Sequence, residues 1–165
     1  MKLLTPALLT ADAFAPYGDV IQCAASAERR QINYGHTERF HNLAALDLLQ
    51  DSGTPLVSIF RSCPIEQPVP IKVMERHPLS SQAFYPLSGR PYLVVVAAAG
   101  DFDAENLRAF IAAADQGVNY HRGVWHHFSL ALGEVSDFLV IDRGGDEKNC
   151  NEVFLEDQDI RIAPV

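Results

Sequence analysis

One short segment of the sequence places a carboxylic acid and an imidazole next to each other. Residues 71–78 read IKVMERHP. In a β-strand alternate side chains share a face, so Glu75 and His77 point the same way as Ile71 and Val73. If that face lines a barrel, the two polar groups lie in a pocket where they can exchange protons with a ligand. If it does not, they form an exposed strand end, as charged strand residues commonly do.

A second segment supplies more imidazoles. Residues 117–127 read GVNYHRGVWHH, and Gln82 and Gly89 lie between the two segments. If residues 124–127 enter a strand, His126 and His127 face opposite sides, so at most one of them points into the pocket. Imidazole titrates near neutral pH, which suits either ring to proton transfer.

Together the two segments resemble the paired motifs of the cupins, in which H-x-H, a glutamate and a glycine form the first and P-x-G-x-x-H the second. Glu75 stands in place of the first histidine, Gln82 in place of the glutamate, and His121 where proline is usual. The resemblance implies a jelly-roll barrel. It also implies that Glu75, His77, Gln82 and His126 converge on one point inside that barrel.

A closer resemblance extends over nearly the whole chain. The sequence is similar to the ureidoglycolate lyase family in blocks that follow the family order, namely 17–21 (YGDVI), 38–41 (ERFH), 75–78 (ERHP) with 82–84 (QAF), 117–121 (GVNYH) with 123–127 (GVWHH), and 137–145 (DFLVIDRGG). The resemblance implies cleavage of (S)-ureidoglycolate to glyoxylate and urea in the allantoin branch of purine degradation. It also implies a cupin-like β fold and a homodimer.

The substrate implied by this resemblance sets the chemistry. Its carboxylate, hydroxyl and urea nitrogen share one carbon, so cleavage is the collapse of a hemiaminal and consumes no water. A catalyst needs a base for the hydroxyl proton and an acid for the departing nitrogen, each of which typically contributes about 10² to 10⁴ in rate. His77 and His126 are the candidates, with Glu75 as an orienting partner or an alternative base. The sequence does not order these roles.

The substrate carboxylate requires a fixed cation or a set of donors. Arg61 alternates with Val57 and Ile59, which we expect on a buried face, and Arg143 precedes two glycines that allow close backbone approach. We therefore expect Arg61 and Arg143 to bind the carboxylate, against the alternative that each forms a surface ion pair. Gln82 and His121 are the other candidates for contact with the substrate.

These residues allow a mechanism with a bound metal as well as one without. If a divalent ion such as Ni²⁺, Mn²⁺ or Zn²⁺ is bound, Glu75, His77, Gln82 and His126 are its expected ligands, and it would lower the pKa of the substrate hydroxyl. Gln82 is a weak neutral ligand in the place where cupins use glutamate. Ni²⁺ and Mn²⁺ are the ions that we consider first.

The elements that must position these residues are mostly strands. Short apolar runs between turn signals predict a mainly β fold, a cupin-like barrel or jelly roll with one or two short helices, in a single domain over 1–165. The expected strands are 56–62, 71–77, 84–87, 92–99, 107–112, 127–132 and 135–142. Apolar residues on both faces of 93–99 indicate a strand covered on both sides. Helices are expected at 42–51, capped by Asn42, and near 10–17, capped by Thr10.

Composition excludes several kinds of partner. The 165 residues carry 13 Lys+Arg against 21 Asp+Glu, a formal charge of −8. A chain this acidic repels phosphate backbones and anionic lipid surfaces, so we expect no nucleic acid or membrane partner. Three widely spaced cysteines form no disulfide framework and fit the reducing cytoplasm. The apolar stretch 3–9 contains Thr5 and Pro6, which argues against a signal peptide.

Two other functions compete with the lyase. One is a metal-dependent cupin enzyme that acts on another small organic acid. The other is a non-catalytic cupin that binds such an acid without converting it.

Overall fold

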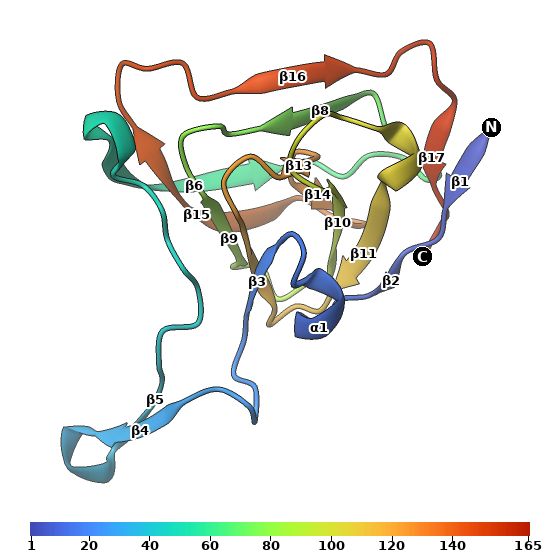
Figure 1. Cartoon of the computed structure of the whole chain (residues 1–165). Coiled ribbons are helices and arrows are strands. Elements are labelled where there is room, and N and C mark those ends of the chain that lie inside the picture. The colour runs from blue at the N-terminus through green and yellow to red at the C-terminus, as the bar shows by residue number, and fades with distance from the viewer.

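Two β-sheets face each other in the structure, a computed structural model that describes residues 1–165. Figure 1 shows the sheets curving around a common interior while a two-stranded hairpin projects away from them. The larger sheet, in the order β16-β8-β13-β10-β11-β2 with β14 also paired to β10, consists of β2 (Ala7–Leu8), β8 (Val73–Arg76), β10 (Tyr92–Ala97), β11 (Arg108–Ala112), β13 (Trp125–His126), β14 (Leu130–Ala131) and β16 (Asn151–Phe154). The facing sheet, in the order β3-β12-β9-β15-β6, consists of β3 (Gly18–Ile21), β6 (Thr54–Ser62), β9 (Gln82–Pro86), β12 (Gly117–Tyr120) and β15 (Ser136–Gly144).

Smaller elements complete the chain. A three-stranded sheet contains β1 (Lys2–Leu4), β17 (Ile160–Ile162) and β7 (Val69–Pro70), and the projecting hairpin contains β4 (Arg29–Ile32) and β5 (Thr37–Phe40). The helices are α1 (Ala11–Phe14) and the 3₁₀ turns η1 (Asn33–Gly35), η2 (Gln50–Ser52) and η3 (Ala104–Asn106). None of these helices is long and apolar enough to cross a membrane. The mainly β, cupin-like fold predicted from the sequence is confirmed.

Strand β10 lies between two apolar cores, as its uniformly apolar sequence predicts. Val94 and Val96 join the core between the two large sheets, where Phe84 also packs. Val95 and Ala97, on the other face of β10, join a second core. Residues of the small sheet, Val69, Ile160 and Ile162, belong to that second core. All six residues of β10 are buried, so this strand is fixed from both sides.

The strand register decides which polar groups enter the barrel. Glu75 on β8 lies opposite His126 on β13, and His126 lies opposite Val96 on β10. Residues directly opposite each other on neighbouring strands share a face of the sheet. Because Val96 belongs to the core between the large sheets, Glu75 and His126 point into the barrel. The expected inward direction of Glu75 is confirmed.

The predicted helix over 42–51 is wrong. Barrel side chains bind the backbone of this segment in an extended path, so its amides do not need helical partners. Asp19 accepts from Ala45 N at 2.9 Å, and Ser81 Oγ accepts from Asp47 N at 2.8 Å. Only the turn η2 forms at its end, whereas the helix expected near Thr10 does form as α1, with Thr10 as its N-cap.

Several strand predictions need correction as well. Of the run expected at 127–132 only Leu130–Ala131 forms a strand, β14, and β13 ends before the run begins. The strand expected to begin at 71 begins at 73. Strands β12 and β16 were not predicted because their polar residues hide the apolar pattern. Strand β16 contributes Glu152 and Phe154 to a polar cavity, whereas β12 contributes Val118 and Tyr120 to the core between the large sheets.

Candidate active site

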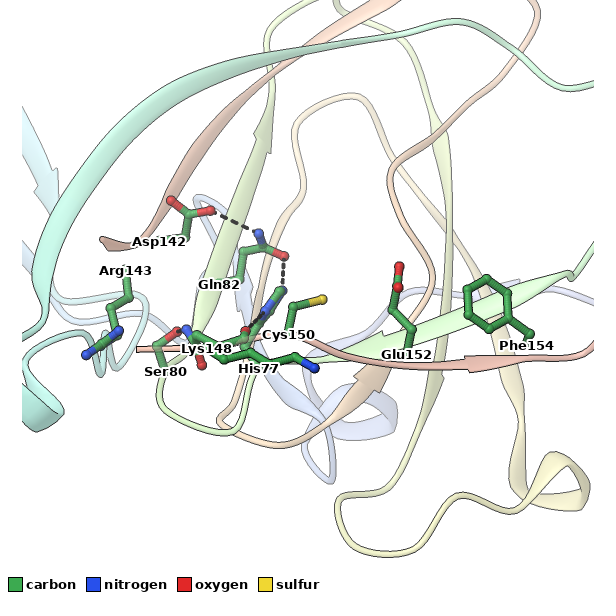
Figure 2. Close-up of a pocket in the computed structure, with 10 residues that line it drawn as sticks. His77, Ser80, Gln82, Asp142, Arg143, Lys148, Cys150, Glu152 and Phe154 are labelled. Carbon is green, nitrogen blue, oxygen red and sulfur yellow. Dashed lines mark hydrogen bonds between the residues drawn. The ribbon is translucent and has the colours of Figure 1, made fainter. Parts of the chain in front are cut away.

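A polar cavity of about 670 Å³ opens where the two large sheets meet the segment that precedes β16. Figure 2 shows its side chains coming from β9, β15 and this late segment. Ten residues line it: His77, Ser80, Gln82, Asp142, Arg143, Lys148, Asn149, Cys150, Glu152 and Phe154. Only two of them are apolar, which suits a small, charged ligand.

His77 stands at the end of β8 with both ring nitrogens close to oxygen atoms. Its Nδ1 lies 2.7 Å from the backbone carbonyl of Asn149, which can only accept, so Nδ1 carries the hydrogen. Its Nε2 lies 3.1 Å from Gln82 Oε1, and Gln82 Nε2 donates to Asp142 Oδ2 at 3.1 Å. Figure 2 shows these contacts as one continuous chain of hydrogen bonds and close approaches.

His126 lies deeper in the barrel than His77. Its ring is 1% exposed and stacks on Tyr120 with centroids 4.2 Å apart and planes 5° apart. The centroid of the His77 ring is 5.1 Å away. Burial, with a smaller contribution from His77, lowers the pKa of His126 to about 3. The ring is therefore neutral near pH 7 and cannot serve as a proton donor there.

Glu75 lies between the two histidines and the late segment. Its Oε1 is 3.7 Å from His126 Nδ1, and its Oε2 is 3.8 Å from the thiol of Cys150. Burial raises the pKa of the Glu75 carboxyl, and the nearby carboxylate of Glu152 adds to the increase while His77 opposes it. The predicted side-by-side arrangement of Glu75 and His77 is thus present in the structure.

These side chains fit a divalent cation. One ligand atom from each of Glu75, His77 and His126 lies within 4.8 Å of the others, and Gln82 Oε1 lies beside His77 Nε2. The Nε2 atom of His126 is buried without a hydrogen-bond partner. Imidazole nitrogens and carboxylate oxygens are ligands for Ni²⁺, Mn²⁺ and Zn²⁺. The bonds from His77 to Asn149 and from Gln82 to Asp142 are of the kind that orients metal ligands.

Arg61 is not in the cavity, so the expectation that it binds a carboxylate there is wrong. It lies on the outer face of β6, its side chain is 73% exposed, and it forms a two-pronged ion pair with Asp137 at 2.8 and 3.0 Å. The residues that alternate with it, Val57 and Ile59, are exposed too. The inner face of β6 instead carries Phe60, which packs against Phe84. Arg61, Val57 and Ile59 do share one face of β6, and that face is the outer one.

Arg143 lines the cavity wall, although its guanidinium is already bound. It is 8% exposed and donates to the backbone carbonyls of Gln50 and Asp51 at 3.1 to 3.2 Å. Figure 2 shows the guanidinium directed away from His77. Gly53 has no room for a Cβ because the Arg143 side chain lies against it. Arg143 therefore fastens the loop that ends in η2 to β15.

His121 lies outside the cavity. It is exposed, and its Nε2 contacts Asp19 Oδ2 at 3.0 Å. Hydrogen bonds from Asn119, Ala45 and His121 lower the pKa of Asp19 despite the opposing effect of burial, which is the largest single contribution. Four residues were expected to bind substrate, namely Arg61, Gln82, His121 and Arg143. Of these, only Gln82 places a polar atom, Oε1, beside His77.

Several residues of the cavity were not expected from the sequence. Asp142 follows Phe138 and Val140 on the inward face of β15. The others belong to residues 148–154, namely Lys148, Asn149, Cys150, Glu152 and Phe154. Lys148 is exposed at the cavity and forms no ion pair, whereas Lys2 pairs with Glu105. In the sequence, Glu152 and Phe154 are two residues apart and follow Gly144-Gly145. This spacing could have predicted a strand with both side chains on the face towards the cavity.

The fold and the His–carboxylate site define the class of protein, a cupin-like β-barrel with its polar site inside the barrel. Within that class, the family description "Ureidoglycolate lyase" matches residues 1–163, and the chain belongs to this family. A ureidoglycolate lyase of Burkholderia mallei (strain NCTC 10229) is 56% identical over 94% of this chain and 91% of its own length. Another, from Pseudomonas aeruginosa (strain LESB58), is 48% identical over 99% and 98%.

A solved structure also resembles the chain. A dTDP sugar isomerase from Desulfovibrio desulfuricans G20 aligns with a TM-score of 0.48 and 17% identity, over 86% of this chain and 87% of the other. A likeness of this size bears on neither fold nor function.

The fit to a divalent cation can be tested by calorimetric titration of chelator-treated protein with Ni²⁺. We expect one site per chain. His126→Asn should weaken it at least tenfold, since even the loss of a partner that merely orients a metal ligand costs about 10- to 100-fold. His121→Asn, which changes an exposed imidazole outside the cavity, is the matched control and should bind as the wild type does. Equal Ni²⁺ affinity in the His126→Asn protein would exclude this site.

Proposed function

We propose that this protein cleaves (S)-ureidoglycolate into glyoxylate and urea, the step that releases urea in allantoin degradation. Membership of the ureidoglycolate lyase family supports the substrate. The observation that carries the proposal is His77, whose Nδ1 is bound by Asn149 O and whose Nε2 faces a polar cavity of about 670 Å³. A ring held in this tautomer presents a lone pair to whatever occupies the cavity.

The reaction follows from the position of that lone pair. Nε2 of His77 removes the proton of the substrate hydroxyl, the carbonyl of glyoxylate forms, and the bond to the urea nitrogen breaks. The departing nitrogen takes up the same proton from the ring, so atoms and charge balance without water. Hydroxyl and nitrogen share one carbon, which places both within reach of a single imidazole. His77 thus acts first as a base and then as an acid.

A bound metal would give His77 a different role, because Nε2 would then be a ligand with no lone pair left to act as a base. A divalent ion, Ni²⁺ or Mn²⁺ in our proposal, would be held by Glu75, His77, Gln82 and His126 and would supply Lewis acidity to the hydroxyl oxygen. Without the ion, the lone pair of His77 Nε2, which lies beside Gln82 Oε1, is the base for the hydroxyl proton.

The substrate carboxylate binds Lys148 in this proposal. Arg61 is on the far side of the sheet, and Nε and Nη2 of Arg143 donate to loop carbonyls, with the guanidinium directed away from His77 (Figure 2). Lys148 lines the cavity, carries a full charge and has no carboxylate partner of its own. A charged hydrogen bond of this kind is worth about 1.5 to 3 kcal/mol.

We also propose a cytoplasmic homodimer. Its three cysteines, Cys23, Cys63 and Cys150, are free thiols, which supports a reducing compartment.

Strand β6 supports the dimer, because it is a nine-residue sheet edge on which no residue is buried. Val57 and Ile59 at its centre are 71% and 61% exposed. Long apolar edges are normally covered, and this one has no uncompensated charge to repel a second copy, since Arg61 is neutralised by Asp137.

The assay for the reaction is release of urea and glyoxylate from (S)-ureidoglycolate by the purified protein. His77→Asn should lower kcat by about 10² to 10⁴ because the positioned base is lost, while circular dichroism remains that of the wild type. His121→Asn should keep its kcat. Near-normal turnover by the His77→Asn protein would refute the assignment of the base.

Lys148→Met tests the carboxylate contact. KM should rise by about tenfold or more with a smaller change in kcat, since the lost hydrogen bond is formed by a charged group. Lys72→Met removes the same charge from an exposed position outside the cavity and should leave KM unchanged. A rise in KM of equal size in both variants would point to the overall field of the protein instead of a direct contact.

The dimer predicts a mass of twice 18.2 kDa by light scattering. Ile59→Lys should yield monomers, because lysine on a sheet edge opposes pairing. Leu8→Lys, at an equally exposed residue on β2, is the control and should remain dimeric. A wild-type protein with the mass of one chain would contradict the proposal.

A further inference from the structure

Asp142 is a carboxylate on the inward-facing side of β15. The residues before it on that face, Phe138 and Val140, are buried in the core between the large sheets. The ladder that pairs Val140 with Phe84 and Ile141 with Ala83 brings Asp142 beside Gln82. Gln82 is 5% exposed and donates its amide hydrogen to Asp142 Oδ2 at 3.1 Å. A charged group at this place calls for a reason beyond packing.

The chemistry of the two side chains fixes the direction of the Gln82 amide. An ionised carboxylate only accepts hydrogen bonds, so the NH₂ of Gln82 must face Asp142 and its Oε1 must face His77. On the far side of the ring, Asn149 O requires the hydrogen on Nδ1. Nε2 of a neutral His77 and Oε1 of Gln82 are then two electron-pair donors 3.1 Å apart with no hydrogen between them.

The opposite orientation of the amide would form a hydrogen bond to His77 at the expense of the one to Asp142. Reversed, Gln82 would donate its NH₂ to His77 Nε2 and occupy the lone pair on which the reaction depends. Asp142 prevents this reversal, because the Gln82 oxygen would then face a carboxylate.

We propose that Asp142 is a positioning residue that binds the amide hydrogens of Gln82 and thereby keeps the His77 Nε2 lone pair available. The lone pair can then take the substrate hydroxyl proton or bind the divalent ion. The kinetic part of this inference rests on the proposed lyase function, whereas the orientation of Gln82 does not.

Asp142→Asn is the first test, since an asparagine at this position can donate to the reversed Gln82 oxygen and leaves no buried group unsatisfied. We expect kcat to fall about 10- to 100-fold, the usual effect of losing a partner that orients an active group, with little change in KM. Asp137→Asn makes the same substitution on the outer face of the same strand and should change kcat by less than about twofold.

A double-mutant cycle separates positioning from a structural role. Gln82→Met has no amide hydrogens and cannot occupy Nε2, so removing Asp142 in that background should have no further effect. The Asp142→Asn/Gln82→Met protein should therefore be as active as Gln82→Met alone. Independent losses that multiply would show that Asp142 acts through stability, and would overturn the proposal.

A measurement without substrate tests the geometry directly. In protein labelled with ¹⁵N-histidine, with His77 assigned through the His77→Asn variant, Nε2 should report a free lone pair in the wild type and a hydrogen-bonded one in Asp142→Asn. Identical Nε2 signals in the two proteins would overturn the inference. Failure of the wild type to cleave ureidoglycolate would instead refute the proposed function, while the spectra would still decide the role of Asp142.

Discussion

The site depends on one row of contacts that crosses the barrel, from Asp142 through Gln82 and His77 to the Asn149 carbonyl. Its members come from β15, β9, the end of β8 and the segment before β16. Each contact fixes the next, since the carboxylate orients the amide and the carbonyl sets the imidazole tautomer. The pairing of β9 with β15 brings two of the four side chains together. The two cores that hold β10 in place keep the surrounding sheet rigid.

Most of the positively charged side chains make contacts within the protein. The arginines, ten in number against three lysines, mostly serve the fold. Arg61 and Arg122 are each bound by two carboxylate oxygens, Arg143 by loop carbonyls, and Arg76 lies over the ring of Trp125. Planar guanidinium groups suit such fixed arrangements. The cation that we propose for a small anionic substrate is a lysine, Lys148.

Individual residues show which parts of the fold and the site can be predicted from the sequence. The alternation that placed Glu75 and His77 together was sufficient, because a strand has a fixed period and its neighbours were plainly apolar. The same rule failed for Arg61, since the period of an edge strand does not tell which face is covered. The helix prediction failed for 42–51, because side chains distant in sequence bind the backbone of that segment. Asp142 and Lys148 were not anticipated because their roles arise only from strand pairing and from the late segment closing over the cavity.

Collapse of a hemiaminal without hydrolysis is the reaction that we propose for this site. The most direct measurement is the product stoichiometry of the purified protein acting on (S)-ureidoglycolate. We predict one urea and one glyoxylate for each molecule consumed, with no ammonia. Release of ammonia, or binding of the substrate without turnover, would contradict this account of the site.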